Sequence, residues 1–172
     1  MSDLPVESKN LSSSKLYPKL VKNDENEYRA EVPEGLQMDD LLGTDTIDAA
    51  NGIFQTAIHS LGKSAEKYGS MASAMFAELE PRDAIEAMLI AQMTATHVTI
   101  STLTERLTYQ TSTEIRESLE RSITRLSRTF IAQMDALKKH RAKAQQTVRV
   151  ERVTVNDGGQ AIVGDVRGAG GG

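Results

Sequence analysis

The stretch from Ala87 to Thr104 contains no Asp, Glu, Lys or Arg, and it restricts the possible folds of this chain more than any other feature. Apolar residues recur through it at helical spacing and form a heptad-like seam with one Thr: Ile85, Leu89, Met93, Thr96, Ile100, Leu103 and Leu107. A second apolar face includes Ala87, Ile90 and Val98. A helix with two apolar faces is predicted to be central, with other helices around it.

A second long helix is predicted directly after the first. Thr111 and Glu114 form a capping-box pattern, and apolar residues then recur at Leu119, Ile123, Leu126, Phe130, Met134 and Leu137. Only Tyr109-Gln110-Thr111 separates the two helices, so Pro81 to Lys143 is expected to fold as an antiparallel helical hairpin. The uncharged stretch holds five Thr together with Gln92, His97 and Ser101, which makes it too polar for a membrane span.

Two further segments precede this hairpin. Residues 1–43 carry nine acidic residues, five basic residues and three prolines, and no helical or strand spacing of apolar residues is sustained. This predicts an acidic, disordered segment. Residues 44–146 are expected to form the helical domain, with a first helix from Thr44 or Asp45 to Tyr68. Gly69 and Ser70 are expected to separate this helix from a shorter one over Met71 to Glu80.

Near the C-terminus the spacing of apolar residues changes from helical to alternating. Residues 147–166 alternate apolar and polar side chains around the turn signal Asn156-Asp157-Gly158-Gly159, which predicts a β-hairpin, and residues 167–172 form a Gly-rich, flexible tail. An isolated hairpin is marginal in water, so pairing between several copies is favoured over packing on the helices of its own chain. The residues expected to mediate this oligomerisation are Val148, Val150, Val153, Val155, Ile162 and Val163.

The sequence shows no constellation of catalytic, cofactor-binding or metal-binding residues. It has no Cys, which excludes disulfides and thiolate chemistry, and no glycine loop of the nucleotide-binding type. His97 is predicted to be a buried, hydrogen-bonded imidazole, and the Thr hydroxyls are predicted to bond backbone carbonyls one turn back. Glu78 and Glu80 are expected to be solvated. The sequence therefore predicts no enzyme, no cofactor and no small-molecule substrate.

One basic stretch is a candidate nucleic-acid-binding face. Between residues 121 and 143 the sequence has seven Lys and Arg residues and a single acidic residue, Asp135. The basic residues are Arg121, Arg125, Arg128, Lys138, Lys139, Arg141 and Lys143. Repeated around a ring, they would bind a phosphate backbone through counterion release. The favoured alternative is a solvated face whose cations pair with Glu114, Glu117 and Glu120, because no aromatic residues are interleaved for base stacking.

The tail sequence Gly158-Gly159-Gln160-Ala161-Ile162-Val163-Gly164, with Phe130 to Lys138 before it, resembles the end of a group of uncharacterised proteobacterial proteins. That resemblance covers roughly residues 82–166 and implies no known activity. The layout of helices before an oligomeric β element is also similar, in architecture only, to phage small terminase subunits. Those subunits carry an N-terminal helix-turn-helix, which residues 1–43 do not resemble.

These features together predict a mainly α protein: a long antiparallel helical hairpin, shorter N-terminal helices, a C-terminal β-hairpin and a disordered N-terminal segment. The expected function is a non-enzymatic, homo-oligomeric scaffold or adaptor with coiled-coil character. The alternative is a ring-forming, phage-related nucleic-acid-binding protein. With no basic and apolar leader at the N-terminus, no signal peptide is predicted and a cytoplasmic location is expected.

Overall fold

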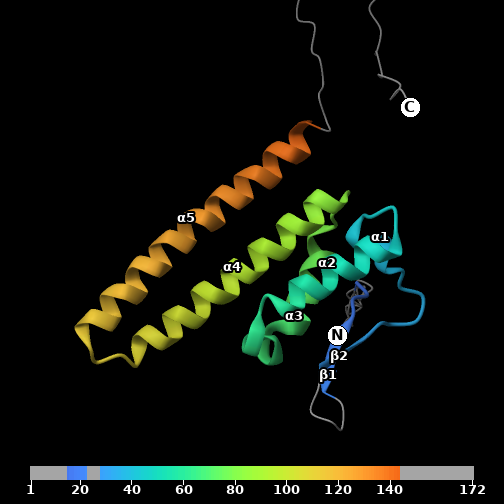
Figure 1. Ribbon diagram of the computed structural model, residues 1–172. Helices are drawn as coiled ribbons and strands as arrows, with labels where there is room; N and C mark the ends of the chain where they lie inside the picture. The colour runs from blue at the N-terminus through green and yellow to red at the C-terminus, as the bar shows by residue number, and fades with distance from the viewer. Residues whose placement is uncertain (1–14, 23–27, 144–172) are drawn as a thin grey trace, which may run out of the picture.

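The computed structural model describes residues 15–22 and 28–143, and it is mainly helical. Two long antiparallel helices, α4 (Ala84–Thr108) and α5 (Thr113–Lys143), lie side by side. On the other side of α4 lie α2 (Ile47–His59) and α3 (Ala65–Leu79), as Figure 1 shows. The predicted central position of the uncharged helix is confirmed, while the predicted C-terminal β-hairpin lies outside the described residues.

Local signals set the helix ends. Asp83 caps α4 by accepting from the Glu86 backbone N–H at 2.9 Å, two residues after the Pro81 break. Thr46 caps α2 in the same way, through the N–H of Ala49 at 3.3 Å. The second long helix begins at Thr113, two residues after the predicted capping residue Thr111.

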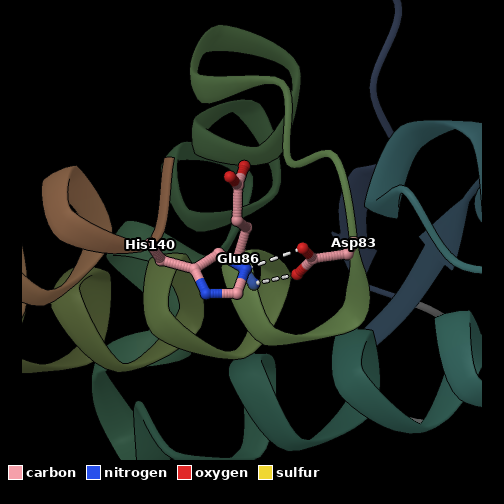
Figure 2. A group of neighbouring side chains, drawn as sticks. All are labelled: Asp83, Glu86 and His140. Carbon is pink, nitrogen blue, oxygen red and sulfur yellow. Dashed lines mark hydrogen bonds and ion pairs between the residues drawn. The ribbon is translucent and has the colours of Figure 1, made fainter. Parts of the chain in front are cut away.

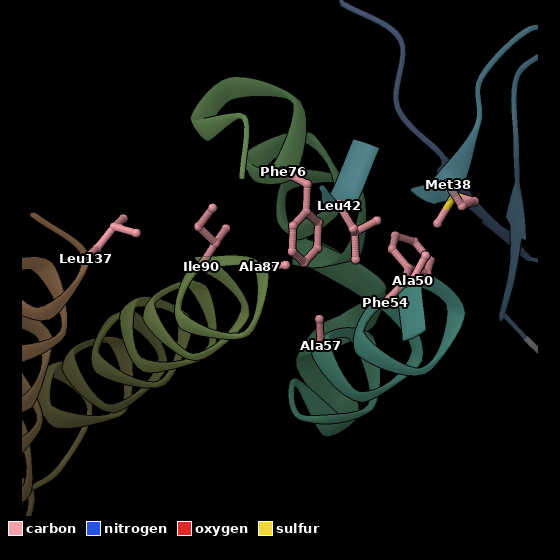
Figure 3. Packing of buried hydrophobic residues seen from close by; sticks show 9 residues of the cluster. All are labelled: Met38, Leu42, Ala50, Phe54, Ala57, Phe76, Ala87, Ile90 and Leu137. Carbon is pink, nitrogen blue, oxygen red and sulfur yellow. The ribbon is translucent and has the colours of Figure 1, made fainter. Parts of the chain in front are cut away.

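The core lies where α1 (Met38–Leu42), α2, α3 and α4 meet (Figure 3). Phe76 from α3 lies 6.3 Å from the ring centre of Phe54 on α2, and both rings are buried. Ala87 and Ile90 of α4 are fully buried in the same cluster. The small side chain of Ala87 allows close approach of neighbouring helices, so the face that contains it is buried more deeply than the heptad seam, whose Ile85 is 51% exposed.

The predicted disorder of residues 1–43 is wrong for residues 15–22 and 28–43, which the structure describes as ordered. Strands β1 (Lys19–Lys22) and β2 (Tyr28–Glu31) pair antiparallel, with Leu20 opposite Ala30, and α1 follows them. Leu42 is fully buried, as is Pro18. These few apolar residues are ordered because α2 and α3 provide a surface on which they pack.

The predicted break at Gly69 and Ser70 is also wrong, because both residues lie inside α3. The break comes earlier, at a 3₁₀ turn (η1, Gly62–Ser64) after α2. Gly69 is buried, and a Cβ there would approach the Leu20 side chain to 2.5 Å, so the glycine allows β1 to lie close against α3. Ser70 then accepts a hydrogen bond from the Leu20 N–H at 3.3 Å.

Replacing Ser73 by Ala is expected to lower the free energy of unfolding by about 1–2 kcal/mol. Its hydroxyl donates to the Pro18 carbonyl at 2.6 Å, and both residues are fully buried, so the variant leaves that carbonyl without a donor. Urea denaturation measures the loss, and amide exchange should accelerate in β1. Ser122→Ala is the control, because its hydroxyl bonds only the Ser118 carbonyl of its own helix. Equal stability of the two variants would show that Ser73 does not hold the strand.

None of the helices in the described ranges is both long enough and apolar enough to cross a membrane.

Candidate functional site

The main polar cluster joins the start of α4 to the end of α5. It consists of Asp83, Glu86 and His140, which Figure 2 shows, together with Arg141. Nε2 of His140 lies 2.7 Å from Oδ2 of Asp83. An ionised carboxylate only accepts hydrogen bonds, so Nε2 of His140 is the donor. The other Asp83 oxygen, Oδ1, caps the helix through the Glu86 N–H. Asp83 therefore fixes both the start of α4 and its contact with α5.

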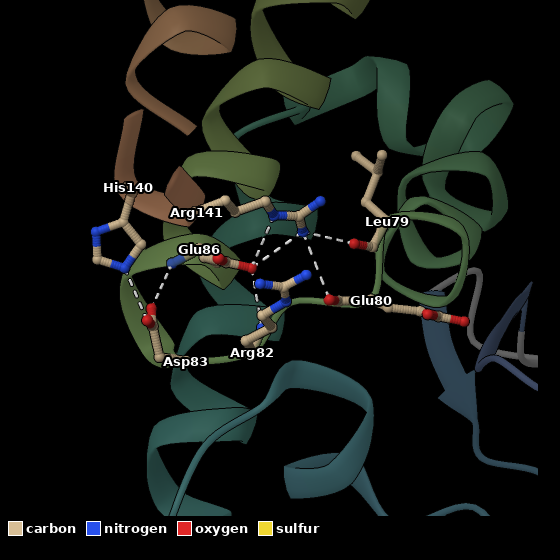
Figure 4. A network of polar contacts seen from close by, with 7 residues as sticks. All are labelled: Leu79, Glu80, Arg82, Asp83, Glu86, His140 and Arg141. Atoms are coloured by element: carbon tan, nitrogen blue, oxygen red, sulfur yellow. Dashed lines mark hydrogen bonds and ion pairs between the residues drawn. The ribbon is translucent and has the colours of Figure 1, made fainter. Parts of the chain in front are cut away.

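Glu86 is the buried member of this cluster, with 1% of its surface exposed. Its Oε2 accepts from Nε and Nη2 of Arg141 at 3.1 and 3.0 Å, and from the Arg82 backbone N–H at 3.0 Å. Nη2 of Arg141 also donates to the Leu79 carbonyl at 2.7 Å, as Figure 4 shows. One guanidinium thus connects the end of α3, the start of α4 and the end of α5.

Ligand atoms of Asp83, Glu86 and His140 lie within 4.8 Å of one another, which is close enough to consider a metal site. The donor set does not fit a cation, however. The Glu86 oxygen already faces the positive guanidinium of Arg141, and His140 donates to Asp83. A cation would have to displace both partners and leave Arg141 beside it. The arrangement is that of a buried ion pair, whose role is to join helices.

The pKa of the Asp83 carboxyl is held below its ordinary value, first by the hydrogen bond from His140 and then by the Glu86 N–H. A carboxyl whose pKa is lower in the folded state stabilises the fold above its unfolded pKa, which is about 3.9. This contribution is lost as the pH falls through the folded pKa. The Asp83 side chain is 48% exposed, so solvent screening limits the effect to about 1 kcal/mol or less.

Asp83→Asn is therefore expected to be slightly less stable than the parent at pH 7, and the difference should vanish as the pH falls below about 4. Asn still caps a helix, so the substitution removes the charge and keeps the cap. Urea titrations of both proteins at a series of pH values measure the difference. A difference that stays constant down to pH 3 would mean that the Asp83 charge does not contribute.

The seven predicted basic residues do not form one group. Exposed positions on α5 hold six of them: Arg121, Arg125, Arg128, Lys138, Lys139 and Lys143. Arg141 turns inward to Glu86 and is removed from the candidate nucleic-acid face. One predicted pairing with the acids of α5 is present, between Nη1 of Arg121 and Glu117 at 3.6 Å.

Other predicted residues have mixed outcomes. His97 is exposed, not buried, and its ring lies 6.2 Å from the Phe130 ring. The prediction for the Thr hydroxyls is confirmed for four of the five Thr, which bond carbonyls four residues earlier: Thr96, Thr99, Thr102 and Thr104. Glu78 and Glu80 are both exposed, as predicted, and Glu80 also pairs with Lys15 at 2.7 Å. The six predicted oligomerisation residues between Val148 and Val163 lie outside the described residues.

Sequence reasoning missed the Glu86–Arg141 pair, because an acid near the start of a helix and a cation near the end of another are each already accounted for by the dipole of their own helix. One signal was present in the sequence. Glu86 stands four residues before the buried Ile90, and so on the apolar side of α4, where a carboxylate requires a partner. An antiparallel second helix with cations at its end supplies that partner.

Comparisons with known proteins give no relative for this chain: no family model, curated protein or solved structure matches it.

Proposed function

We propose that this protein is a non-enzymatic, homo-oligomeric scaffold whose long helical hairpin is an assembly surface. The observation that carries the proposal is the exposure of α5: among its 31 residues only Leu137 is buried. The helix packs mainly along α4, which is a single neighbour (Figure 1). A helix of about 46 Å that packs mainly on one neighbour leaves most of its surface available to a partner.

The apolar stripe of α5 supports the same proposal. Its members are half-buried: Leu119, Ile123, Leu126, Phe130 and Met134. Beside Phe130, an open groove of about 220 Å³ runs between α3 and α4 and is lined by Met71, Met75 and Met93. Outside the stripe, Ile131 is 55% exposed and Ile115 is 47% exposed. Helical bundles cover such residues with further helices, and a second copy of the chain is the simplest source.

Light scattering of the full chain tests the proposal. A discrete oligomer with a mass that is a multiple of 18.8 kDa is expected, and a monomer at every concentration would contradict it. Truncation after Gln146 then separates the helices from the predicted C-terminal hairpin. If the helices form the assembly, the truncated chain keeps its subunit number; a folded monomer would assign the assembly to residues 147–166.

A second candidate function is nucleic-acid binding in a ring-forming, phage-related assembly. The observation that favours it is the exposure of Arg121, Arg125 and Arg128 along α5, with Lys139 and Lys143 further along the helix. Binding to duplex DNA that weakens steeply as salt rises would support this function. If the protein does not bind DNA at low salt, the nucleic-acid-binding function is wrong and the scaffold function is kept.

A further inference from the structure

Charges on the surface of α5 that faces away from α4 are segregated along the helix. Residues 113–120 contribute Glu114, Glu117 and Glu120, and residues 121–128 contribute Arg121, Arg125 and Arg128 without any acid. The one cation of the first block, Arg116, directs Nη1 toward the Leu107 and Gln110 carbonyls at 3.4 and 3.5 Å, and its Nη2 lies 3.9 Å from Oε1 of Glu120. The outer surface therefore carries an acidic block followed by a basic block.

Most of these residues share one surface. A shallow hollow of about 350 Å³ is lined by Glu117, Glu120, Arg121, Thr124, Arg125 and Arg128, which we call the outer face of α5. Glu117 and Arg128 are about three helical turns apart, so both lie on the same side of the helix. Between them, Thr124 is short, and its hydroxyl already donates to the Glu120 carbonyl at 2.9 Å. The middle of this face is thus suited to close approach of another helix.

We infer that the outer face of α5 binds the same face of a second copy, antiparallel and about a two-fold axis level with the turn from Arg121 to Thr124. In that arrangement the acidic block of each copy lies opposite the basic block of the other, and Glu117 lies opposite the partner subunit's Arg128. A parallel arrangement would place like charges together. The inference rests on the proposed scaffold function and identifies one surface that the scaffold uses, on the side of α5 opposite its apolar stripe.

Ion pairs on a surface contribute little affinity each, so these charges act mainly by selecting orientation and register. The apolar area of the contact comes from the aliphatic stems of the arginines and glutamates, which cover the neighbouring helix. The same charges provide a sensitive test, because reversing one residue in a two-fold contact replaces two attractive pairs by two repulsive ones.

Sedimentation equilibrium of charge-reversed variants of the full chain tests the inference. Glu117→Arg and Arg128→Glu are each expected to weaken self-association at least roughly tenfold, and the double variant should recover most of that loss. Glu34→Arg and Lys63→Glu are matched controls, because both residues are exposed and lie outside α5. Circular dichroism establishes that the helix content of each variant is unchanged.

The outcomes separate this inference from the proposed function. A wild-type chain that is monomeric at all concentrations overturns both. A wild-type oligomer that neither reversal weakens overturns the α5 contact and keeps the scaffold. If each reversal weakens the oligomer and the double variant does not recover, the direct pairing of the two residues is wrong. If Glu117→Arg binds duplex DNA more tightly and self-associates as the parent does, the outer face serves nucleic acid instead.

Discussion

Arg141→Ala is expected to lower the free energy of unfolding by about 3 kcal/mol or more, one of the two largest effects of a single substitution in this protein. The guanidinium is the charged partner of Glu86, which is 1% exposed and keeps only the Arg82 N–H in the variant. Its loss also removes the donor to the Leu79 carbonyl. A buried carboxylate without a counter-charge is costly, whereas the pair itself adds little net stability. Chemical denaturation measures the change.

The control for this variant removes both charges. Glu86→Leu combined with Arg141→Met is expected to recover most of the lost stability, because apolar residues of similar volume replace a buried pair at little cost. Arg141→Lys should fall between the parent and the Ala variant, since an ammonium group keeps the charge and cannot reach all the acceptors. If Arg141→Ala loses less than about 1 kcal/mol, the pair is effectively solvated and does not join the helices.

Gly43→Ala is expected to lower the free energy of unfolding by about 2–4 kcal/mol, for two reasons that add. Gly43 has a φ of +61° in the left-handed region where α1 ends, with the Thr44 N–H donating to the Asp39 carbonyl. A Cβ at this position would also collide with the Pro81 carbonyl oxygen and approach the Arg82 carbonyl carbon to 2.8 Å. These contacts are backbone atoms before α4, which cannot move aside as a side chain can.

Gly35→Ala provides the matched control for the second of these reasons. Gly35 also has a positive φ, +82°, but a Cβ there meets nothing within 4 Å. Gly35→Ala should lower the free energy of unfolding by about 1 kcal/mol, because only the backbone strain at positive φ contributes. Thermal or urea unfolding of both variants isolates the collision with residues 81–82. Equal losses would show that α1 does not approach the start of α4 as closely as described.

The long helices could be predicted from the sequence because their signals are local and repeated. Apolar residues at helical spacing, the Pro81 break and the Asp83 cap all lie within the segments that they define. Strands β1 and β2 could not, because four residues each give too short a pattern. The residues that hold this segment in place lie some fifty positions later in the chain, on α3: the buried Gly69, Ser70 and Ser73.

The polar cluster shows the same limit for charged residues. Arg141 stands among Lys138, Lys139 and Lys143, and a local reading counts all four as one exposed basic end. The structure separates Arg141 from them because antiparallel packing brings it to Glu86, which lies 55 residues earlier in the chain. Pairing of this kind depends on the relative position of two helices, which the sequence specifies only through the packing of their apolar faces.

The most direct test of a subunit contact on α5 is amide hydrogen exchange of the full chain at several protein concentrations. If the outer face of α5 binds a second copy, exchange in residues 113–131 should slow as the concentration rises, while exchange in α2 should stay unchanged. Exchange in α5 that is the same at every concentration, in a chain of monomeric mass, would contradict the central proposal.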